Sequence, residues 1–128
     1  MEIIGTGVDA TEISRIAAAI ERYGDRFVNR IFTDEEVAYC SRKRDAAASF
    51  AARFAAKEAA MKALGTGHSL GVFWRGIEVV RRSGPPQMRF HHGAADRFAS
   101  IGATGSFLTM THSRDMAIAH VLLVRGPA

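Results

Sequence analysis

The sequence predicts an α+β fold, in which helices pack on a mainly antiparallel sheet. Three observations support this class. The first half of the 128 residues is dominated by alanine-rich segments of helical composition, and the second half by short strand-like segments between turn residues. The expected elements follow in the order βαααββαββ, which groups helices and strand pairs and does not alternate them. The length is that of one domain covering residues 1–128.

The N-terminal segment predicts a strand followed by a helix. Residues 2–9 are largely apolar, and Gly5 and Gly7 indicate that another part of the molecule approaches this strand closely. Residues 11–23 have the apolar periodicity of a helix, which Gly24 ends.

Two further helices are expected before the middle of the chain. Residues 25–32 are expected to form a loop or short turns. The Thr33–Glu36 segment has the pattern of a capping box, which begins a short helix. Residues 45–64 consist almost entirely of good helix formers, and Gly65 follows as a C-terminal stop.

The second half predicts two strand pairs and one helix. The last strand is apolar on both faces, so we expect a further helix or another subunit to cover the face turned away from the helices. The expected strands are residues 72–82, 87–91, 105–111 and 116–124, and the helix is residues 93–101.

Composition excludes several classes of protein. One cysteine, Cys40, allows no intrachain disulfide and no cysteine zinc cluster. No apolar run approaches the roughly 20 residues of a membrane span, and the N-terminus has no signal-peptide or transit-peptide pattern. We therefore expect a cytoplasmic protein that is too small for a two-domain dehydrogenase or a kinase. The net charge is +4, and fourteen of the seventeen basic residues are Arg, which binds phosphate and carboxylate in two-pronged fashion. High genomic GC content also enriches Arg, so composition alone assigns no partner.

Glu58 is the first candidate for a functional role. On a helical projection it falls in the middle of the apolar face of the 45–64 helix, with Arg53 and Lys57 on the other side. A carboxylate on a buried face is costly unless it is paired or binds a metal. The structural alternative is an ion pair with Lys62, one turn further along the helix. The helical phase favours the functional role.

Asp9 is the second candidate, because it follows the first strand directly. It caps the next helix, as Thr11 also could, or it holds a metal at the strand end. Two carboxylates without cysteine suit a hard cation such as Mg²⁺. Taken alone, the pair of Asp9 and Glu58 is a weak signal.

Basic residues give a third feature. Arg15, Arg22 and Arg26 share one face of the first helix if the helical phase continues past Gly24. Such a stripe binds phosphates or an acidic helix, or it is simply a solvated face.

His112 stands at the turn between the last two strands, after Thr111. A turn histidine is more often exposed than catalytic, and His68 carries no signal of its own. The Gly65–Gly67 segment is too short for a phosphate-binding loop motif.

The motifs taken together resemble those of one family, the small holo-acyl-carrier-protein synthases, which are 4′-phosphopantetheinyl transferases. The resemblance extends over residues 3–124. The segments that carry it are Gly5–Asp9 with Glu12–Ile16, Phe32–Thr33 with Glu36 and Tyr39, Arg53–Ala59, Lys62–Gly67, Ile77–Val79, Gly84–Pro86 and Thr109–Ser113.

The resemblance implies that coenzyme A donates its phosphopantetheine arm to a serine of apo-acyl carrier protein, in support of fatty acid biosynthesis. It implies a Mg²⁺ ion on Asp9 and Glu58, with Lys62 beside the phosphates. Glu58, a metal-bound water or hydroxide, or Lys62 would take the serine proton. It further implies a homotrimer with active sites between neighbouring subunits. The implied coenzyme A ligands are Lys62, Gly65, Thr66, Gly67, Thr111 and His112, and the implied carrier-binding residues are Arg15, Arg22 and Arg26.

Two other classes of function remain open at this point. A small Mg²⁺-dependent hydrolase would need water and no carrier. A nucleic-acid-binding module would use the arginine stripe, show salt-steep binding and not need Asp9. If the protein is such a transferase, we expect neither nucleic acid nor a membrane as its partner.

Overall fold

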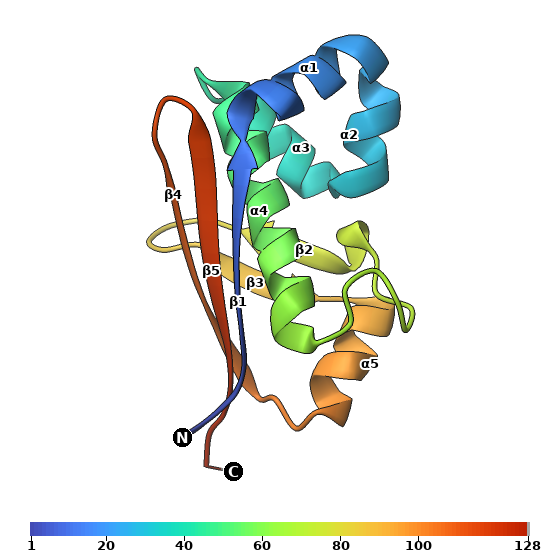
Figure 1. Cartoon of the computed structure of the whole chain (residues 1–128), viewed down its shortest axis with the longest axis vertical. Helices are drawn as coiled ribbons and strands as arrows, with labels where there is room; N and C mark the ends of the chain where they lie inside the picture. Colours follow the sequence, from blue (N-terminus) through green and yellow to red (C-terminus); the bar gives the residue numbers. More distant parts are fainter. Residues whose placement is uncertain (128) are drawn as a thin grey trace.

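A long antiparallel sheet and one central helix organise the molecule (Figure 1). The computed structural model describes residues 1–127. The sheet has the order β1-β5-β4, from β1 (Glu2–Glu12), β4 (Gly105–His112) and β5 (Met116–Arg125). Helix α4 (Ala46–Leu64) lies along this sheet and packs on β1 and β5. The helix begins at the cap Asp45 and ends at Gly65 in the left-handed conformation, as predicted.

Small residues allow α4 to lie directly on the backbone of β1. A Cβ atom at Gly5 would stand 2.1 Å from the carbonyl oxygen of Ala63, and one at Gly7 would stand 1.9 Å from that of Ala59. No side chain fits at either glycine. The close approach predicted for this strand is therefore confirmed, and it brings the end of β1 beside the middle of α4.

Three short helices cover one end of the sheet and of α4 (Figure 1). They are α1 (Ile13–Tyr23), α2 (Asp25–Ile31) and α3 (Asp34–Ser41). Thr33 begins α3 with both hydrogen bonds of a capping box, as predicted. The prediction of a loop or short turns at residues 25–32 is wrong, because α2 fills most of this segment. The helical phase of α1 does not continue into α2, since Gly24 has a φ of +55° between them.

A second, two-stranded sheet lies beside the middle of α4, and a helix lies towards the other end (Figure 1). The elements are the 3₁₀ turn η1 (Trp74–Gly76), β2 (Ile77–Val80), β3 (Gln87–Phe90) and α5 (His92–Ser100). The strand predicted from residue 72 thus begins only at Ile77. Every strand pair is antiparallel, so the predicted α+β class is confirmed, with two sheets where one was expected.

Helix α4 is buried on nearly every side, which corrects the prediction that Lys57 and Arg53 lie on an outer face. Lys57 has no exposed side-chain surface, and its Nζ lies 2.7 Å from Oε1 of the equally buried Glu36. Lys57 also donates to the carbonyl oxygens of Trp74 and Ile77. All three donors of the ammonium group are used, so this buried charge fastens η1 to α4.

The two faces of the main sheet differ in their cover. On β5 the side chains turned towards α4 are fully buried, namely Ala117, Ala119, Val121 and Leu123. The opposite face exposes Val8, Phe107 and Ile118 by 56, 55 and 41%. Within residues 1–127 no element covers this second face. Among those same residues, no helix has the length and apolar character needed to cross a bilayer.

Candidate active site

Asp9 and Glu58 line the same cavity, of about 320 Å³. Asp9 stands near the end of β1 and Glu58 midway along α4, and the close packing of these elements brings the carboxylates to one place. Arg15 from α1 contributes a positive charge to the lining, and Phe27 and Phe54 contribute apolar surface. The structure thus places together two acids that are 49 positions apart in the sequence.

Asp9 does not cap a helix. The N-cap of α1 is Glu12, which makes no side-chain capping bond. The Asp9 carboxylate accepts a hydrogen bond from Thr11 Oγ1 at Oδ2 (2.9 Å) and one from Lys62 Nζ at Oδ1 (3.1 Å). The predictions that Asp9 or Thr11 caps this helix are therefore wrong. The Asp9 carboxylate instead lines the cavity.

Lys62 pairs with Asp9 and not with Glu58. Its Nζ also donates to the carbonyl oxygen of Val8 (2.8 Å), and 56% of its side chain is exposed. The ion pair between Glu58 and Lys62 is thus not what holds Glu58. An exposed ammonium group beside the cavity is free to contact a bound anion.

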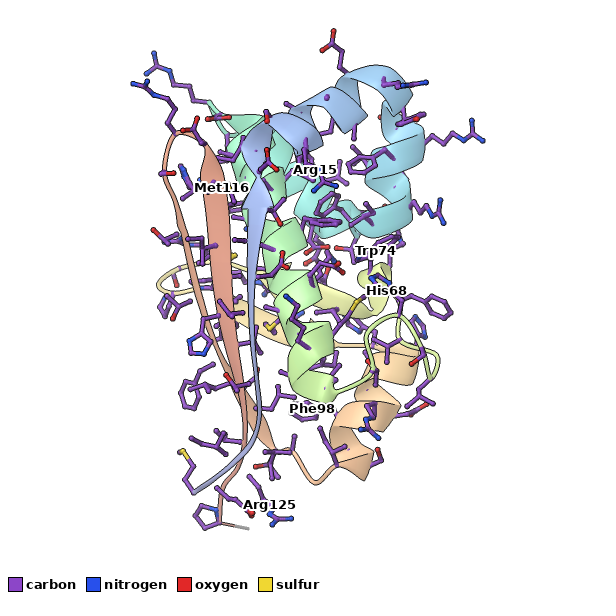
Figure 2. The ribbon with its side chains drawn as sticks, viewed as in Figure 1. Arg15, His68, Trp74, Phe98, Met116 and Arg125 are labelled. Carbon is purple, nitrogen blue, oxygen red and sulfur yellow. The ribbon has the colours of Figure 1, made fainter. Side chains whose placement is uncertain are left out.

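Glu58 is held by two residues that the sequence did not single out. Oε2 accepts hydrogen bonds from Trp74 Nε1 (3.1 Å) and from His68 Nε2 (2.9 Å). Both side chains lie beside α4, with their rings 4.7 Å apart, edge to face (Figure 2). Glu58 is half-buried, with 25% of its side chain exposed, because the cavity opens over this part of the helix.

The donor set of this cavity fits a Mg²⁺ ion. It consists of carboxylate oxygens, and the Asp9 carboxylate already faces one cation, the Lys62 ammonium group. Among residues 1–127 there is no cluster of three or more His, Cys, Asp or Glu side chains around one point. Two carboxylates leave coordination positions for phosphate oxygens and water, as is typical of Mg²⁺.

A second cavity, of about 350 Å³, shares no lining residue with the first. Thr111 and His112 lie here, and so do four basic side chains, Lys43, Arg44, Arg53 and Arg81. Burial raises the pKa of Tyr39 in the same wall, but the neighbouring cations Lys43 and Arg53 outweigh that effect and lower it overall. This cavity, called the basic pocket below, suits an anionic ligand.

Arg53 gives the basic pocket unused hydrogen-bond donors. Its side chain is 97% buried, since only 3% of the residue is exposed, and it lies 4.1 Å from the centre of the Tyr39 ring. Nη1 donates to Ser49, whereas Nε and Nη2 have no partner within residues 1–127. A buried guanidinium group with idle donors is costly unless a ligand completes its hydrogen bonds.

The glycine segment after α4 belongs to neither of these two linings. Gly65 ends the helix, and the buried Thr66 donates from Oγ1 to the carbonyl oxygen of Gly67. The roles expected for Gly65, Thr66 and Gly67 remain predictions.

The arginine stripe is divided between two helices. Arg15 and Arg22 lie on α1, and Arg26 lies on α2 because Gly24 separates the two. Arg26 lines a third cavity, with Tyr23, Phe27 and Arg30. Phe27 also lines the cavity of Asp9 and Glu58, so the basic surface of α1 and α2 adjoins the two carboxylates.

The chain is similar in sequence to known proteins along nearly its whole length. A family model described as the 4′-phosphopantetheinyl transferase superfamily matches residues 5–119. Holo-[acyl-carrier-protein] synthases of Koribacter versatilis and Methylobacterium radiotolerans are 49% and 48% identical to the chain. These matches cover 94% and 98% of this chain, and 98% and 96% of the respective relatives.

Solved structures agree with this result. The holo-[acyl-carrier-protein] synthase of Neisseria meningitidis is similar with a TM-score of 0.88 at 30% identity, over 96% of this chain and 99% of that one. The Bacillus anthracis enzyme, solved in complex with CoA (3′,5′-ADP), is similar with a TM-score of 0.79 at 29% identity, over 98% of this chain and 100% of that one. With the family pattern present from β1 to β5, the chain belongs to the holo-[acyl-carrier-protein] synthases of the 4′-phosphopantetheinyl transferase superfamily.

Proposed function

We propose that this protein transfers the 4′-phosphopantetheine arm of coenzyme A to a serine of apo-acyl carrier protein and releases adenosine 3′,5′-bisphosphate. The observation that carries the proposal is the joint cavity of Asp9 and Glu58, with Lys62 and Arg15 at its edge. The relatives are named for this reaction, and one of them is solved with CoA (3′,5′-ADP). The reaction supplies carrier protein for fatty acid biosynthesis, and we place it in the cytoplasm.

Asp9 and Glu58 would hold a Mg²⁺ ion in this cavity. When bound, the ion neutralises charge on the pyrophosphate of coenzyme A. Lys62 reaches the same phosphates from the cavity edge, because its ammonium group is exposed and, within residues 1–127, is tied only to Asp9 and to the carbonyl oxygen of Val8. Its point charge favours the build-up of negative charge on the leaving phosphate.

The basic pocket is proposed to bind the nucleotide end of coenzyme A for a neighbouring subunit. The unpartnered donors of Arg53 and the position of His112 support this role. Since the basic pocket and the carboxylate cavity share no residue, two chains side by side would complete one site. The uncovered face of the main sheet supports a homotrimer that closes around this face.

The arginines of α1 and α2 are proposed to bind the carrier protein. Arg15 lines the carboxylate cavity itself, and Arg26 lines the adjoining one. Acyl carrier proteins are acidic, so an acidic helix laid across Arg15, Arg22 and Arg26 would present its serine to the cavity.

A mass spectrum tests the proposed reaction directly. Apo-carrier incubated with this protein, coenzyme A and Mg²⁺ should gain the mass of one phosphopantetheine arm. Omitting the carrier should leave coenzyme A intact. Release of adenosine 3′,5′-bisphosphate without carrier would indicate a hydrolase and would contradict the proposal.

A further inference from the structure

Both hydrogen bonds to Glu58 reach the same carboxylate oxygen. Trp74 Nε1 and His68 Nε2 both donate to Oε2. An ionised carboxylate only accepts, so His68 must carry its proton on Nε2 in this contact. Within residues 1–127 no group donates to Oε1, which leaves that oxygen for a ligand from outside the chain.

Trp74 is itself held firmly. The carbonyl oxygen of Trp74 accepts a hydrogen bond of 2.9 Å from Lys57 Nζ, the buried ammonium group paired with Glu36. The Trp74 ring lies against Phe54 at 6.1 Å, and the guanidinium group of Arg30 lies 5.9 Å from it on α2. His68 packs edge-on against the same ring. The indole is thus fixed at its backbone and at its ring.

We propose that Trp74 and His68 are positioning residues that orient the Glu58 carboxylate for its metal ion. The inference rests on the proposed function, because it assumes that Glu58 binds Mg²⁺. Two donors on Oε2 stop the carboxylate from rotating and keep Oε1 as the ligating oxygen. Groups that orient a metal ligand in this way affect metal affinity without touching the metal. Neither side chain contacts the reacting atoms.

The first test measures metal binding without any substrate. Mn²⁺, which like Mg²⁺ prefers oxygen ligands, is titrated into the protein while free Mn²⁺ is followed by electron paramagnetic resonance. Trp74→Phe and His68→Leu each remove one donor, and we expect Mn²⁺ affinity to fall by about 10- to 100-fold. His68→Gln keeps an N–H donor and should recover most of the affinity lost in His68→Leu.

Matched controls come from the same part of the chain. Phe73→Leu changes an aromatic side chain that is 68% exposed, next to Trp74. His92→Gln changes an exposed histidine at the start of α5. Both controls should bind Mn²⁺ as the wild type does. Thermal unfolding of every variant separates a loss of affinity from a loss of folded protein.

Trp74 also serves as a built-in probe, since it is the only tryptophan of the chain. Paramagnetic Mn²⁺ bound at Glu58 should quench its fluorescence in a saturable way, with the same midpoint as the resonance titration. Glu58→Ala should show no saturable quenching. His68→Leu should show quenching with its midpoint moved to higher Mn²⁺.

Kinetics completes the test, and the outcomes are distinguishable. In Trp74→Phe and His68→Leu we expect a higher Mg²⁺ requirement and a lower kcat, with the KM for coenzyme A within about twofold of wild type. If these variants bind Mn²⁺ as the wild type does while Glu58→Ala does not, the positioning role is overturned and the metal site stands. If Glu58→Ala itself binds Mn²⁺ normally, the proposed metal site is overturned, and the positioning role with it.

Discussion

At the scale of single residues, the two carboxylates of the cavity are restrained in different ways. Asp9 uses both oxygens, one towards Thr11 and one towards the Lys62 ammonium group. Glu58 uses one oxygen twice. In the proposed metal site, Asp9 would exchange the Lys62 ammonium group for the metal ion, and Lys62 would then be left to contact the substrate phosphates.

Asp9→Asn should reduce transfer by at least about 100-fold, because the amide keeps the size of the side chain but loses the charge that the metal requires. The fold should persist, since Asp9 caps no helix. The measurement is the initial rate by mass spectrometry beside the thermal unfolding midpoint. Asp96→Asn, at an exposed position on α5, is the control. An Asp9→Asn protein with near-normal rates would remove Asp9 from the proposed metal site.

At the scale of elements, β2 is tied to two helix starts through one side chain. Glu78 is 7% exposed, and it accepts hydrogen bonds from Thr33 Oγ1 (2.6 Å) and His91 Nε2 (3.0 Å). Thr33 is the cap of α3 and His91 the cap of α5. A change at Glu78 should therefore affect the start of α3 and the start of α5.

Acid should weaken this tie. Burial raises the pKa of Glu78, but the hydrogen bonds from Thr33 and His91 outweigh that effect and hold it below its ordinary value of 4.5. A lowered pKa in the folded state adds stability above the unfolded pKa, and this stability is lost as the pH falls through the folded value. Below about pH 4.5, the free energy of unfolding should thus fall more steeply in the wild type than in Glu78→Gln. Urea unfolding between pH 6 and about pH 3 measures this, with the exposed Glu35→Gln as control. Parallel slopes in the wild type and Glu78→Gln would contradict it.

Reversing the charge on α1 should raise the KM for carrier protein more than the KM for coenzyme A. Arg15→Glu and Arg22→Glu should raise the KM for carrier by about 10-fold or more, since like charges replace complementary ones. The wild-type rate at low carrier concentration should also fall with salt, because exposed charges are screened within about 8 Å at physiological ionic strength. Steady-state kinetics against each substrate measures both effects, and Arg89→Glu on β3 is the control of equal charge change. A selective loss of coenzyme A affinity would reassign these arginines to the nucleotide.

The elements also show what sequence could and could not predict. The roles of Gly5, Gly7 and the Thr33 capping box could be predicted, because each depends on the backbone close to that residue. Helix α2 was missed because it has seven residues and its N-cap, Gly24, has no side chain to cap it. Lys57 was misplaced because a helical projection assumes one buried face, whereas α4 is enclosed by strands and helices together.

The candidate site was predicted in the same uneven way. Asp9 and Glu58 follow from their places at a strand end and on a helix face. Trp74 reaches Glu58 from a 3₁₀ turn and His68 from a loop, 16 and 10 residues further along the chain, where no periodic pattern links them to it. The one available signal was that a half-buried tryptophan needs an acceptor for its N–H group.

At the scale of the whole molecule, one assembly would account both for the uncovered face of the main sheet and for the separation of the two cavities. The main sheet leaves an apolar face with Val8, Phe107 and Ile118 exposed. If coenzyme A binds as proposed, the basic pocket and the carboxylate cavity each contribute half of its site. A closed ring of identical chains would cover the face and join the halves with one type of contact. We therefore expect sedimentation equilibrium to give a mass three times the 13.9 kDa of one chain.

Mixing two inactive variants should restore part of the activity. Asp9→Ala removes a ligand from the carboxylate cavity, and His112→Ala alters the basic pocket. In a trimer with shared sites, a site works when its carboxylate cavity comes from a His112→Ala chain and its basic pocket from an Asp9→Ala chain. Random exchange of equal amounts gives such a site with a probability of about one quarter. Transfer rates should thus rise to about a quarter of wild type after the subunits are exchanged in mild urea, and each variant treated alone should stay inactive. A trimer in which the mixture never regains activity would confine each site to one chain, and an active monomer at micromolar concentration would refute the assembly itself.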